Sequence, residues 1–124
     1  MPDTYNIVWN GNAVGEIELM SRDMWYLEGK YILSGTEIST EFEKRLRDGD
    51  MKAFQQDPET NSLKVILHNT ENADLVLYCL AIYIDDNVIN LRQLASSEAI
   101  DKFFHKPKYP RILSFILSIF NPKL

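Results

Sequence analysis

The pattern of apolar and polar residues at the start of the chain predicts a β-hairpin. Large apolar side chains recur at every second position, which is the period of a strand with one buried face: Tyr5, Ile7 and Trp9. Residues 10–12 then read Asn-Gly-Asn, and both residue types tolerate the positive φ of a tight turn. Beyond the turn, Glu16 and Glu18 alternate with apolar residues. Residues 4–20 are therefore predicted to form two antiparallel strands.

The next apolar segment, from Met24 to Leu33, predicts a third strand after a polar turn at residues 21–23. Strand alternation assigns one set of side chains to the core: Trp25, Leu27, Gly29, Tyr31 and Leu33. The opposite set forms a mixed outer face: Met24, Tyr26, Glu28, Lys30 and Ile32. Because Gly29 lacks a side chain, we expect a bulge or the close approach of a helix there.

A helix is predicted to follow this strand. Ser34 and Glu37 have the spacing of a capping box. Apolar residues then recur every four positions: Ile38, Phe42 and Leu46. Two acid–base pairs stand four residues apart in the favourable order: Glu41 with Arg45, and Glu43 with Arg47. We expect the helix to stop near residues 48–50, and residues 51–56 to add a further helical turn.

The second half of the chain predicts three more strands and two more helices. Strands are expected at residues 63–68, 75–84 and 88–91, and the run LVLYCLAIYI predicts a strand that is apolar on both faces. Ser96 or Ser97 is expected to cap a short helix, and a last helix is expected over residues 110–120, from Pro110 to Phe120. The order β-β-β-α-β-β-β-α-α predicts an α+β fold with a mostly antiparallel sheet of about six strands and helices mainly on one face.

Length and charge narrow the classes of function. At 124 residues the chain is expected to form a single domain, residues 1–124. Residues 1–101 carry all 18 acidic side chains against eight basic ones, whereas residues 102–124 carry five basic side chains and no acidic one. An acidic body disfavours nucleic acid and favours a basic protein partner. The absence of a signal-peptide pattern, of a long apolar run and of a cysteine pair predicts a cytoplasmic protein, with membrane association disfavoured.

Residues able to carry chemistry are few. Cys79, the one cysteine, lies in the most apolar run and is predicted to be a packed core thiol. His68 and His105, the two histidines, lack the spacing of metal ligands. Residues 85–87, Asp-Asp-Asn, match a turn better than a cation loop. We therefore predict no catalytic residue, no cofactor and no metal site, and a protein that is not an enzyme.

Aromatic and acidic residues of the first three strands provide the candidate binding surface. Trp9 and Trp25 are expected to pack across neighbouring strands in the core. Tyr26 falls on the outer face beside Glu28, where an aromatic side chain among charges is typical of an anchor for a protein partner. The predicted partner-binding residues are Tyr26, Glu28, Glu16 and Glu18.

The segment DMWYLEGKY, with GNAVGEIE upstream, resembles small uncharacterised bacterial proteins that carry a DMWYLEG-like segment. The resemblance implies no activity and no functional residues. Small acidic single domains without catalytic motifs are also similar in size and charge to bacterial immunity proteins. The leading hypothesis is a non-enzymatic protein-binding module, in the form of an immunity-type inhibitor of a basic partner protein.

Two alternatives remain open from the sequence. The basic, apolar segment at residues 110–120 can pack inside its own domain, form a homodimer or associate with a membrane surface. A protein that oligomerises or binds a membrane surface through this segment is the second hypothesis. The weakest hypothesis is a small-ligand or catalytic pocket among Trp25, Tyr31 and Glu16.

Overall fold

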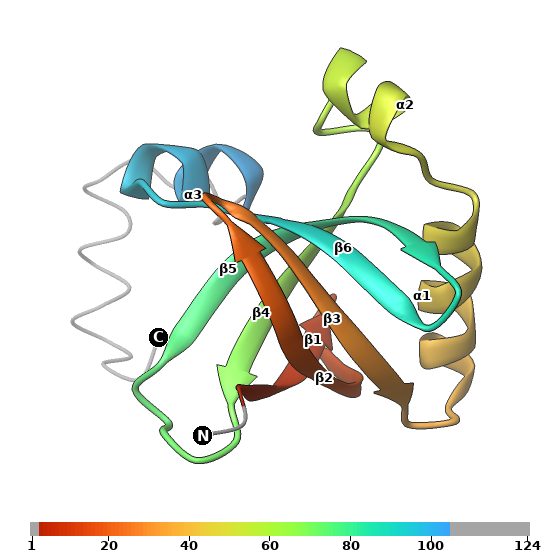
Figure 1. Ribbon diagram of the computed structural model, residues 1–124, viewed down its shortest axis with the longest axis vertical. Coiled ribbons are helices and arrows are strands. Elements are labelled where there is room, and N and C mark those ends of the chain that lie inside the picture. The colour runs from red at the N-terminus through yellow and green to blue at the C-terminus, as the bar shows by residue number, and fades with distance from the viewer. Residues whose placement is uncertain (1–2, 105–124) are drawn as a thin grey trace, which may run out of the picture.

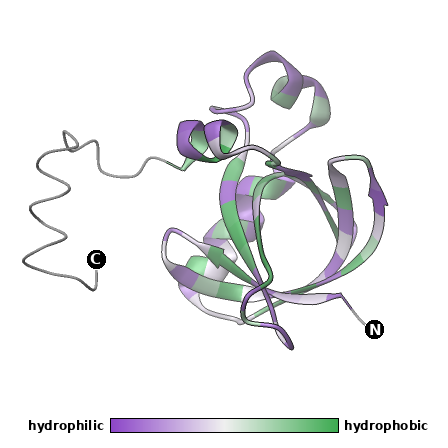
Figure 2. Cartoon of the chain, turned by 90° about the vertical axis from the view of Figure 1, so that its left-hand side faces the viewer, coloured by the Kyte–Doolittle hydropathy of each residue, from purple (hydrophilic) through white to green (hydrophobic). Residues whose placement is uncertain are grey.

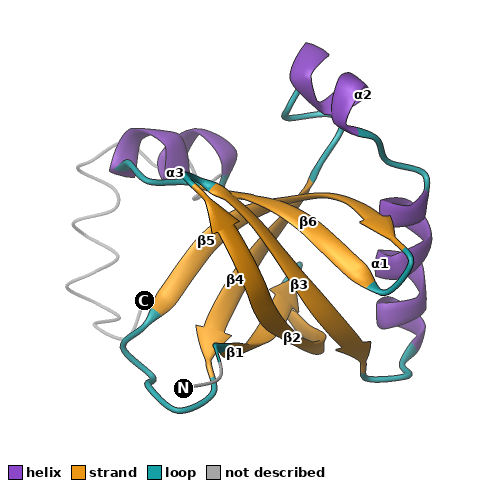
Figure 3. Ribbon diagram, in the orientation of Figure 1, coloured by secondary structure: helices purple, strands orange, loops and turns teal. Residues whose placement is uncertain are grey.

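The structure is a computed structural model of the chain, and it describes residues 3–104 (Figure 1). Six antiparallel strands make up its sheet: β1 (Thr4–Trp9), β2 (Asn12–Asp23), β3 (Tyr26–Leu33), β4 (Leu63–Asn69), β5 (Val76–Asp85) and β6 (Val88–Gln93). Three helices accompany these strands: α1 (Glu37–Arg47), α2 (Met51–Gln56) and α3 (Ser97–Phe103). In the chain order, α1 and α2 both come between β3 and β4. Figure 3 shows all three helices outside the ring of strands.

The sheet closes into a barrel with the strand order β1-β2-β3-β6-β5-β4 (Figure 2). Each half of the chain contributes three consecutive antiparallel strands. Pairing of β1 with β4 and of β3 with β6 joins the halves. The predicted α+β fold with six antiparallel strands is confirmed. Helices on one face of the sheet are not confirmed, because a closed barrel has an inner face, an outer face and two ends, and the helices occupy different ones.

The turns at the two ends of β2 decide the register of the first half. Asn10 and Gly11 both have positive φ, 51° and 78°, as a two-residue hairpin turn requires. The second turn was predicted at residues 21–23, but β2 continues through Asp23 and the turn comes at Met24 and Trp25. Met24 takes the left-handed conformation, with φ of 56°. Cross-strand pairing extends β2 through polar residues that the sequence pattern assigns to a turn.

Gly29 lies where two strands approach closely. A Cβ at this position would stand 2.5 Å from Cγ1 of Ile17 and 2.8 Å from the carbonyl oxygen of Glu18. The neighbour that requires a glycine is therefore β2, not a helix. The expected irregularity is present in β2, where the register shifts between Leu19 and Ser21, opposite Gly29 and Glu28.

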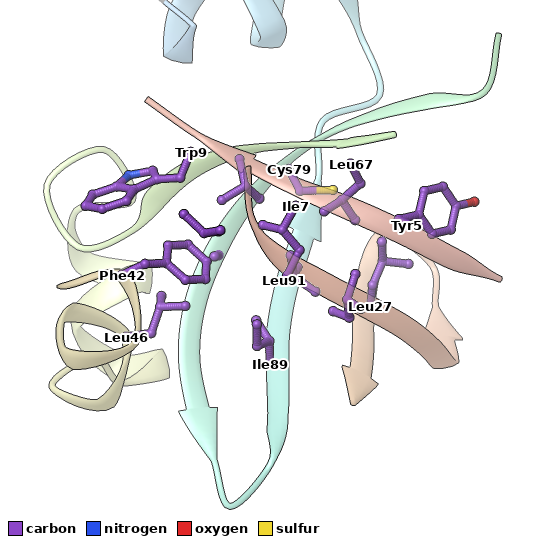
Figure 4. Packing of buried hydrophobic residues seen from close by; sticks show 14 of the residues in the cluster. Tyr5, Ile7, Trp9, Leu27, Phe42, Leu46, Leu67, Cys79, Ile89 and Leu91 are labelled. Carbon is purple, nitrogen blue, oxygen red and sulfur yellow. The ribbon is translucent and has the colours of Figure 1, made fainter. Parts of the chain in front are cut away.

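The interior of the barrel is filled by the inward side chains of all six strands. Figure 4 shows how this core extends from Trp9, Phe42 and Leu46 at one end toward Tyr5 and Leu27 at the other. Phe42 and Leu46 come from α1, which lies across its end of the barrel at the right of Figure 1. The rings of Trp9 and Phe42 are 5.6 Å apart. The predicted stripe on α1 is therefore confirmed, and its role is to cover one end of the barrel.

The beginning of α1 differs from the predicted capping box. Thr36, not Ser34, is the N-cap residue, and its hydroxyl accepts a hydrogen bond from the backbone N–H of Ser39 at 3.2 Å. Ser34 contributes through a contact of 3.1 Å between its hydroxyl and that of Thr36. Gly35, with φ of 84°, lies between them and turns the chain out of β3.

The outer surface of β5 is covered as well as its inner surface. Two helices cover it with a second apolar cluster, whose buried members are Phe54, Leu80, Ile82 and Leu94. Asp50 caps α2 and Ser96 caps α3, each accepting a backbone N–H through its side chain. The prediction that this strand is apolar on both faces is confirmed, and the second face is explained by α2 and α3. The last predicted helix, at residues 110–120, lies outside the described residues.

Candidate functional site

The outer face of β2 and β3 carries three of the four predicted partner-binding residues as exposed side chains. Glu16 and Glu18 project from β2, and Glu28 projects from β3. Pairing places Glu18 opposite Lys30, and the hydroxyl of Ser21 donates to Glu28 at 3.4 Å. We call this surface, defined by Glu16, Glu18, Glu28, Lys30 and Ile32, the acidic face. The buried helical residues of the described structure pack elsewhere, at the end of the barrel and over β5.

Ile32 is the most exposed large apolar side chain of the described residues, at 79%. It lies opposite Glu16 in the β2–β3 pairing. Together they line a hollow of about 340 Å³ whose other walls include Thr4, Glu18 and Lys30. Sequence reasoning placed Ile32 on the outer face but did not select it. The period-two pattern that selected Tyr26 applies equally to Ile32.

Tyr26 differs from the predicted exposed anchor. Its ring is half-buried and packs against the cluster that α2 and α3 form over β5. The guanidinium of Arg92 lies 5.1 Å from the centre of the ring. Tyr26 and Glu28 share a smaller hollow of about 200 Å³ with Met51 and Tyr83. The four predicted residues therefore divide between two neighbouring hollows.

The predicted core position of Trp25 is wrong. Trp25 lies in the turn between β2 and β3, is 40% exposed, and its carbonyl oxygen accepts the backbone N–H of Gln93 at 2.7 Å. Trp9 therefore packs on Phe42 and not on Trp25. The proposed pocket of Trp25, Tyr31 and Glu16 is not assembled: Tyr31 and Glu16 line the same hollow, whereas the residues that line it do not include Trp25.

Tyr31 belongs to a polar link between the barrel and α1. Its hydroxyl donates to Glu43 at 2.6 Å and accepts from Arg47 at 3.0 Å. Arg47 also donates to the carbonyl oxygen of Asp86 at 3.1 Å. Burial, followed by the hydrogen bond to Glu43, raises the pKa of Tyr31 to about 12. The hydroxyl is therefore protonated at neutral pH and already engaged in the link.

The pair of Glu43 and Arg47 within this link was predicted from its spacing. Their closest charged atoms are 3.6 Å apart, and those of Glu41 and Arg45 are 2.9 Å apart. Both predicted pairs are confirmed. The connection of the first pair to Tyr31 was not predicted, because it joins residues whose proximity depends on the position of α1 against the barrel.

The other residues considered for chemistry, namely Cys79, the turn at residues 85–87 and His68, occupy positions that the fold explains. Cys79 is fully buried, and burial raises the pKa of its thiol to about 12, which keeps the thiolate unpopulated at neutral pH. The expected turn between β5 and β6 is present at residues 86–87, with Asp86 at a φ of 60°, and Asp85 is the last residue of β5. His68 lies half-buried in β4, and His105 lies outside the described residues. Residues 3–104 contain no group of three or more side chains suited to hold a metal ion.

A partly exposed apolar surface, separate from the acidic face, lies at the end of the barrel opposite α1. We call it the open end, and it is defined by Tyr5, Leu19, Met20, Leu27, Leu75 and Leu77. These side chains line a hollow of about 370 Å³ together with Asp3, Ser21 and Arg22. Met20 and Leu75 are 52% and 39% exposed there. This surface was not predicted, because it combines β1, β2, β3 and β5.

Neither the family models nor the curated proteins nor the solved structures contain a match to this chain. Among residues 3–104, no helix has both the length and the apolar character needed to cross a membrane.

Proposed function

We propose that this chain is a non-enzymatic protein-binding module that recognises a basic partner protein through the acidic face. The observation that carries the proposal is that three exposed carboxylates, Glu16, Glu18 and Glu28, lie on two paired strands whose outer side bears no buried helical side chain. Carboxylates held on paired strands keep a constant spacing. A rigid set of like charges costs little to order when an oppositely charged surface binds.

The apolar side chain of Ile32 supports a binding role for this face. A single exposed apolar group surrounded by charges resembles the anchor-and-rim arrangement of protein interfaces. The charges steer the encounter, and burial of the isoleucine contributes to the lifetime of the complex. Lys30, opposite Glu18, makes the face mixed and favours a partner surface that is basic with at least one acidic group.

The charge of the whole body favours the same class of partner. Residues 3–104 carry 18 acidic and nine basic side chains, a net charge of −9. Such a field accelerates association with a basic protein and opposes binding to nucleic acid. Within this class we favour an immunity-type inhibitor, a small acidic protein that covers a functional surface of a basic partner.

The surroundings of Cys79 and Tyr31 support a function without catalysis. The thiol is buried and protonated, and the phenol already links β3 to α1. Neither group presents a free nucleophile or base to the hollows described above. Binding through a surface needs no such group.

The test compares charge removal on the acidic face with equal charge removal elsewhere. The variant Glu16→Gln/Glu18→Gln/Glu28→Gln changes the net charge by the same amount as the control Glu71→Gln/Asp74→Asn/Asp101→Asn, whose three positions are also exposed. Each protein is immobilised and exposed to lysate of the source organism, and retained proteins are identified by mass spectrometry. We expect the unaltered and control proteins to retain the same basic protein at low salt, and the face variant to bind it at least about tenfold more weakly.

Salt supplies the second measurement in this test. Binding of the purified partner should weaken as ionic strength rises, because exposed charge pairs are screened beyond about 10 Å at 0.1 M salt. Equal loss of binding in the face and control variants would contradict a role for this face. Retention of no basic protein at low salt would contradict the proposed function as a whole.

A further inference from the structure

The two ends of the barrel differ in the cover that the described residues provide. At one end, α1 buries Phe42 and Leu46 against Trp9. Five large apolar side chains are exposed among the described residues: Met20, Met24, Trp25, Ile32 and Leu75. Met20 and Leu75 line the open end, and Met24 and Trp25 lie beside it in the turn between β2 and β3. Among the described residues, exposed apolar side chains are therefore more numerous at and beside the open end than on the acidic face, where Ile32 stands alone.

The topology of the barrel relates its two ends. The two halves of the barrel are topologically equivalent. If β1, β2 and β3 change places with β4, β5 and β6, the order of strands around the barrel stays the same. The two pairings that join the halves, β1 with β4 and β3 with β6, also stay the same. The chain leaves β3 at one end of the barrel, and α1 then covers that end. Since β6 is antiparallel to β3, the chain leaves β6 at the open end. The segment after β6 is thus the topological equivalent of the segment that covers the first end.

The described chain also ends near this surface. The ring of Phe104, the last described residue, packs edge-on against Tyr78 with 5.2 Å between ring centres. Tyr78 follows Leu77, which lines the open end. Strands in a sheet stand about 4.8 Å apart, so Tyr5 on β1 lies two strands, or about 10 Å, from β5. Seven residues span up to about 23 Å, so residues 105–111 are long enough to bring the following residues over the hollow.

We propose that the open end is the docking site of the chain's own residues 112–120. These residues read ILSFILSIF, in which seven of nine side chains are large and apolar. Residues 105–124 carry four basic side chains and no acidic one, against the net charge of −9 of residues 3–104. Attachment to the same chain raises the effective concentration of the segment at the hollow to the millimolar range, so modest apolar burial suffices for docking.

Oxidation of methionines by hydrogen peroxide tests the proposal on the intact chain. Met20 lines the open end, whereas Met24 is 75% exposed in the β2–β3 turn and does not line the hollow. A docked segment shields Met20, so we expect its oxidation, followed by peptide mass spectrometry, to be at least about fivefold slower than that of Met24. Equal rates for Met20 and Met24 in the intact protein would overturn the proposal without any variant.

Two variants identify the segment responsible for the shielding. Phe115→Asp/Ile116→Asp places two charges in the apolar run and should raise the Met20 rate to that of Met24. The control Ser114→Asp/Ser118→Asp adds the same charge at the polar positions of the run and should leave Met20 shielded. Met51, the half-buried first residue of α2, reports whether the barrel stays folded in both variants. Shielding that persists in the Phe115→Asp/Ile116→Asp variant would overturn the proposal.

Concentration and lipid distinguish the other possible occupants. Shielding by the chain's own segment is independent of dilution, because the contact is intramolecular. Shielding of Met20 that disappears on dilution would assign the open end to a second copy and overturn the proposal. Shielding that appears only with vesicles of phosphatidylcholine and phosphatidylserine would assign it to a membrane surface, with the same consequence. These outcomes do not involve the acidic face, so they leave the proposed function to its own test.

Discussion

The outward side chains of β2 and β5 differ in character, although each strand is the middle strand of its half of the barrel. β2 presents Glu16 and Glu18 to solvent, whereas β5 presents Tyr78, Leu80 and Ile82 to a cluster formed with α2 and α3. Both strands bury their inward side chains in the same core. The core of the barrel therefore requires apolar side chains only on the inward side of each strand. The apolar outer surface of β5 requires a cover, and the charged outer surface of β2 is free to meet a partner.

The largest expected effect comes from removing an outward side chain of the covered half. Leu80 is 1% exposed, so Leu80→Ala should lower the free energy of unfolding by about 2–5 kcal/mol through lost burial and a residual cavity. Glu18→Ala, on the uncovered half, should change it by no more than about 0.5 kcal/mol. Urea unfolding monitored by circular dichroism measures both values. A Leu80→Ala cost below about 1 kcal/mol would show that the helical cover contributes little.

The second prediction contrasts a thiol of each half. Cys79 lies in β5 with both sides covered, so iodoacetamide should modify it at least about a hundredfold more slowly in the native protein than in denaturing urea. The thiol introduced by Ser21→Cys, at an exposed position of β2, should react rapidly under native conditions. Peptide mass spectrometry separates the two sites. Rapid native modification of Cys79 would contradict its assignment as a packed core thiol.

A smaller effect is expected from the link that holds the uncovered half against α1. Tyr31→Phe removes a hydroxyl that donates to Glu43 and accepts from Arg47, so it should cost about 1 kcal/mol of stability at pH 7. In a cycle with Glu43→Gln the two costs should add to more than the cost of the double variant. Additive costs would show that the two residues do not act as a unit.

The same link predicts a dependence of stability on pH. Because folding raises the pKa of Tyr31 from 10 to about 12, its contribution is present below pH 10 and is lost as the pH rises toward 12. Stability of the unaltered protein should fall across this range, and Tyr31→Phe should reduce the fall. Cys79 adds to the same trend from a lower pH, since folding raises its pKa from 9 to about 12. An undiminished fall in Tyr31→Phe would contradict the role given to the phenol.

The smallest expected change in stability is at the exposed apolar side chain of the acidic face. Ile32→Thr keeps a β-branched residue in β3 and removes little buried surface, so the free energy of unfolding should change by at most about 0.5 kcal/mol. Affinity for the basic partner should fall several-fold, because the apolar anchor is lost. Calorimetric unfolding and titration with the purified partner measure the two effects. A stability loss as large as that of Leu80→Ala would mean that the face is covered.

Most elements follow from local patterns. Period-two alternation located β1, β3 and β4, and the four-residue recurrence of Phe42 and Leu46 located α1. The predictions from sequence were wrong where contact with a distant segment of the chain determines the position of a side chain. Trp25 is large and apolar like a core residue, but the extension of β2 along β3 places it in a turn. Tyr26 alternates to the outside, but α2 and α3 supply the cluster that half-buries it.

The acidic face could be predicted more completely than the other surfaces. Glu16, Glu18 and Glu28 were assigned from alternation alone, because the period of a strand determines which side chains share a face. Ile32 was available from the same pattern. The open end was not predictable, since its hollow combines Tyr5, Leu27 and Leu77 from three strands that are separate in the sequence.

The sequence by itself determined the types of the elements, the sides of the strands and the acidic character of the protein, because these depend on residues within a few positions of one another. Only the tertiary structure decided that the sheet closes, that α1 lies across one end and that α2 and α3 cover β5. Closure depends on the β1–β4 and β3–β6 pairings, which join distant segments through backbone hydrogen bonds common to every residue type. Local patterns therefore carry little information about which strands pair. The pairing of the strands in turn determines which surfaces stay uncovered.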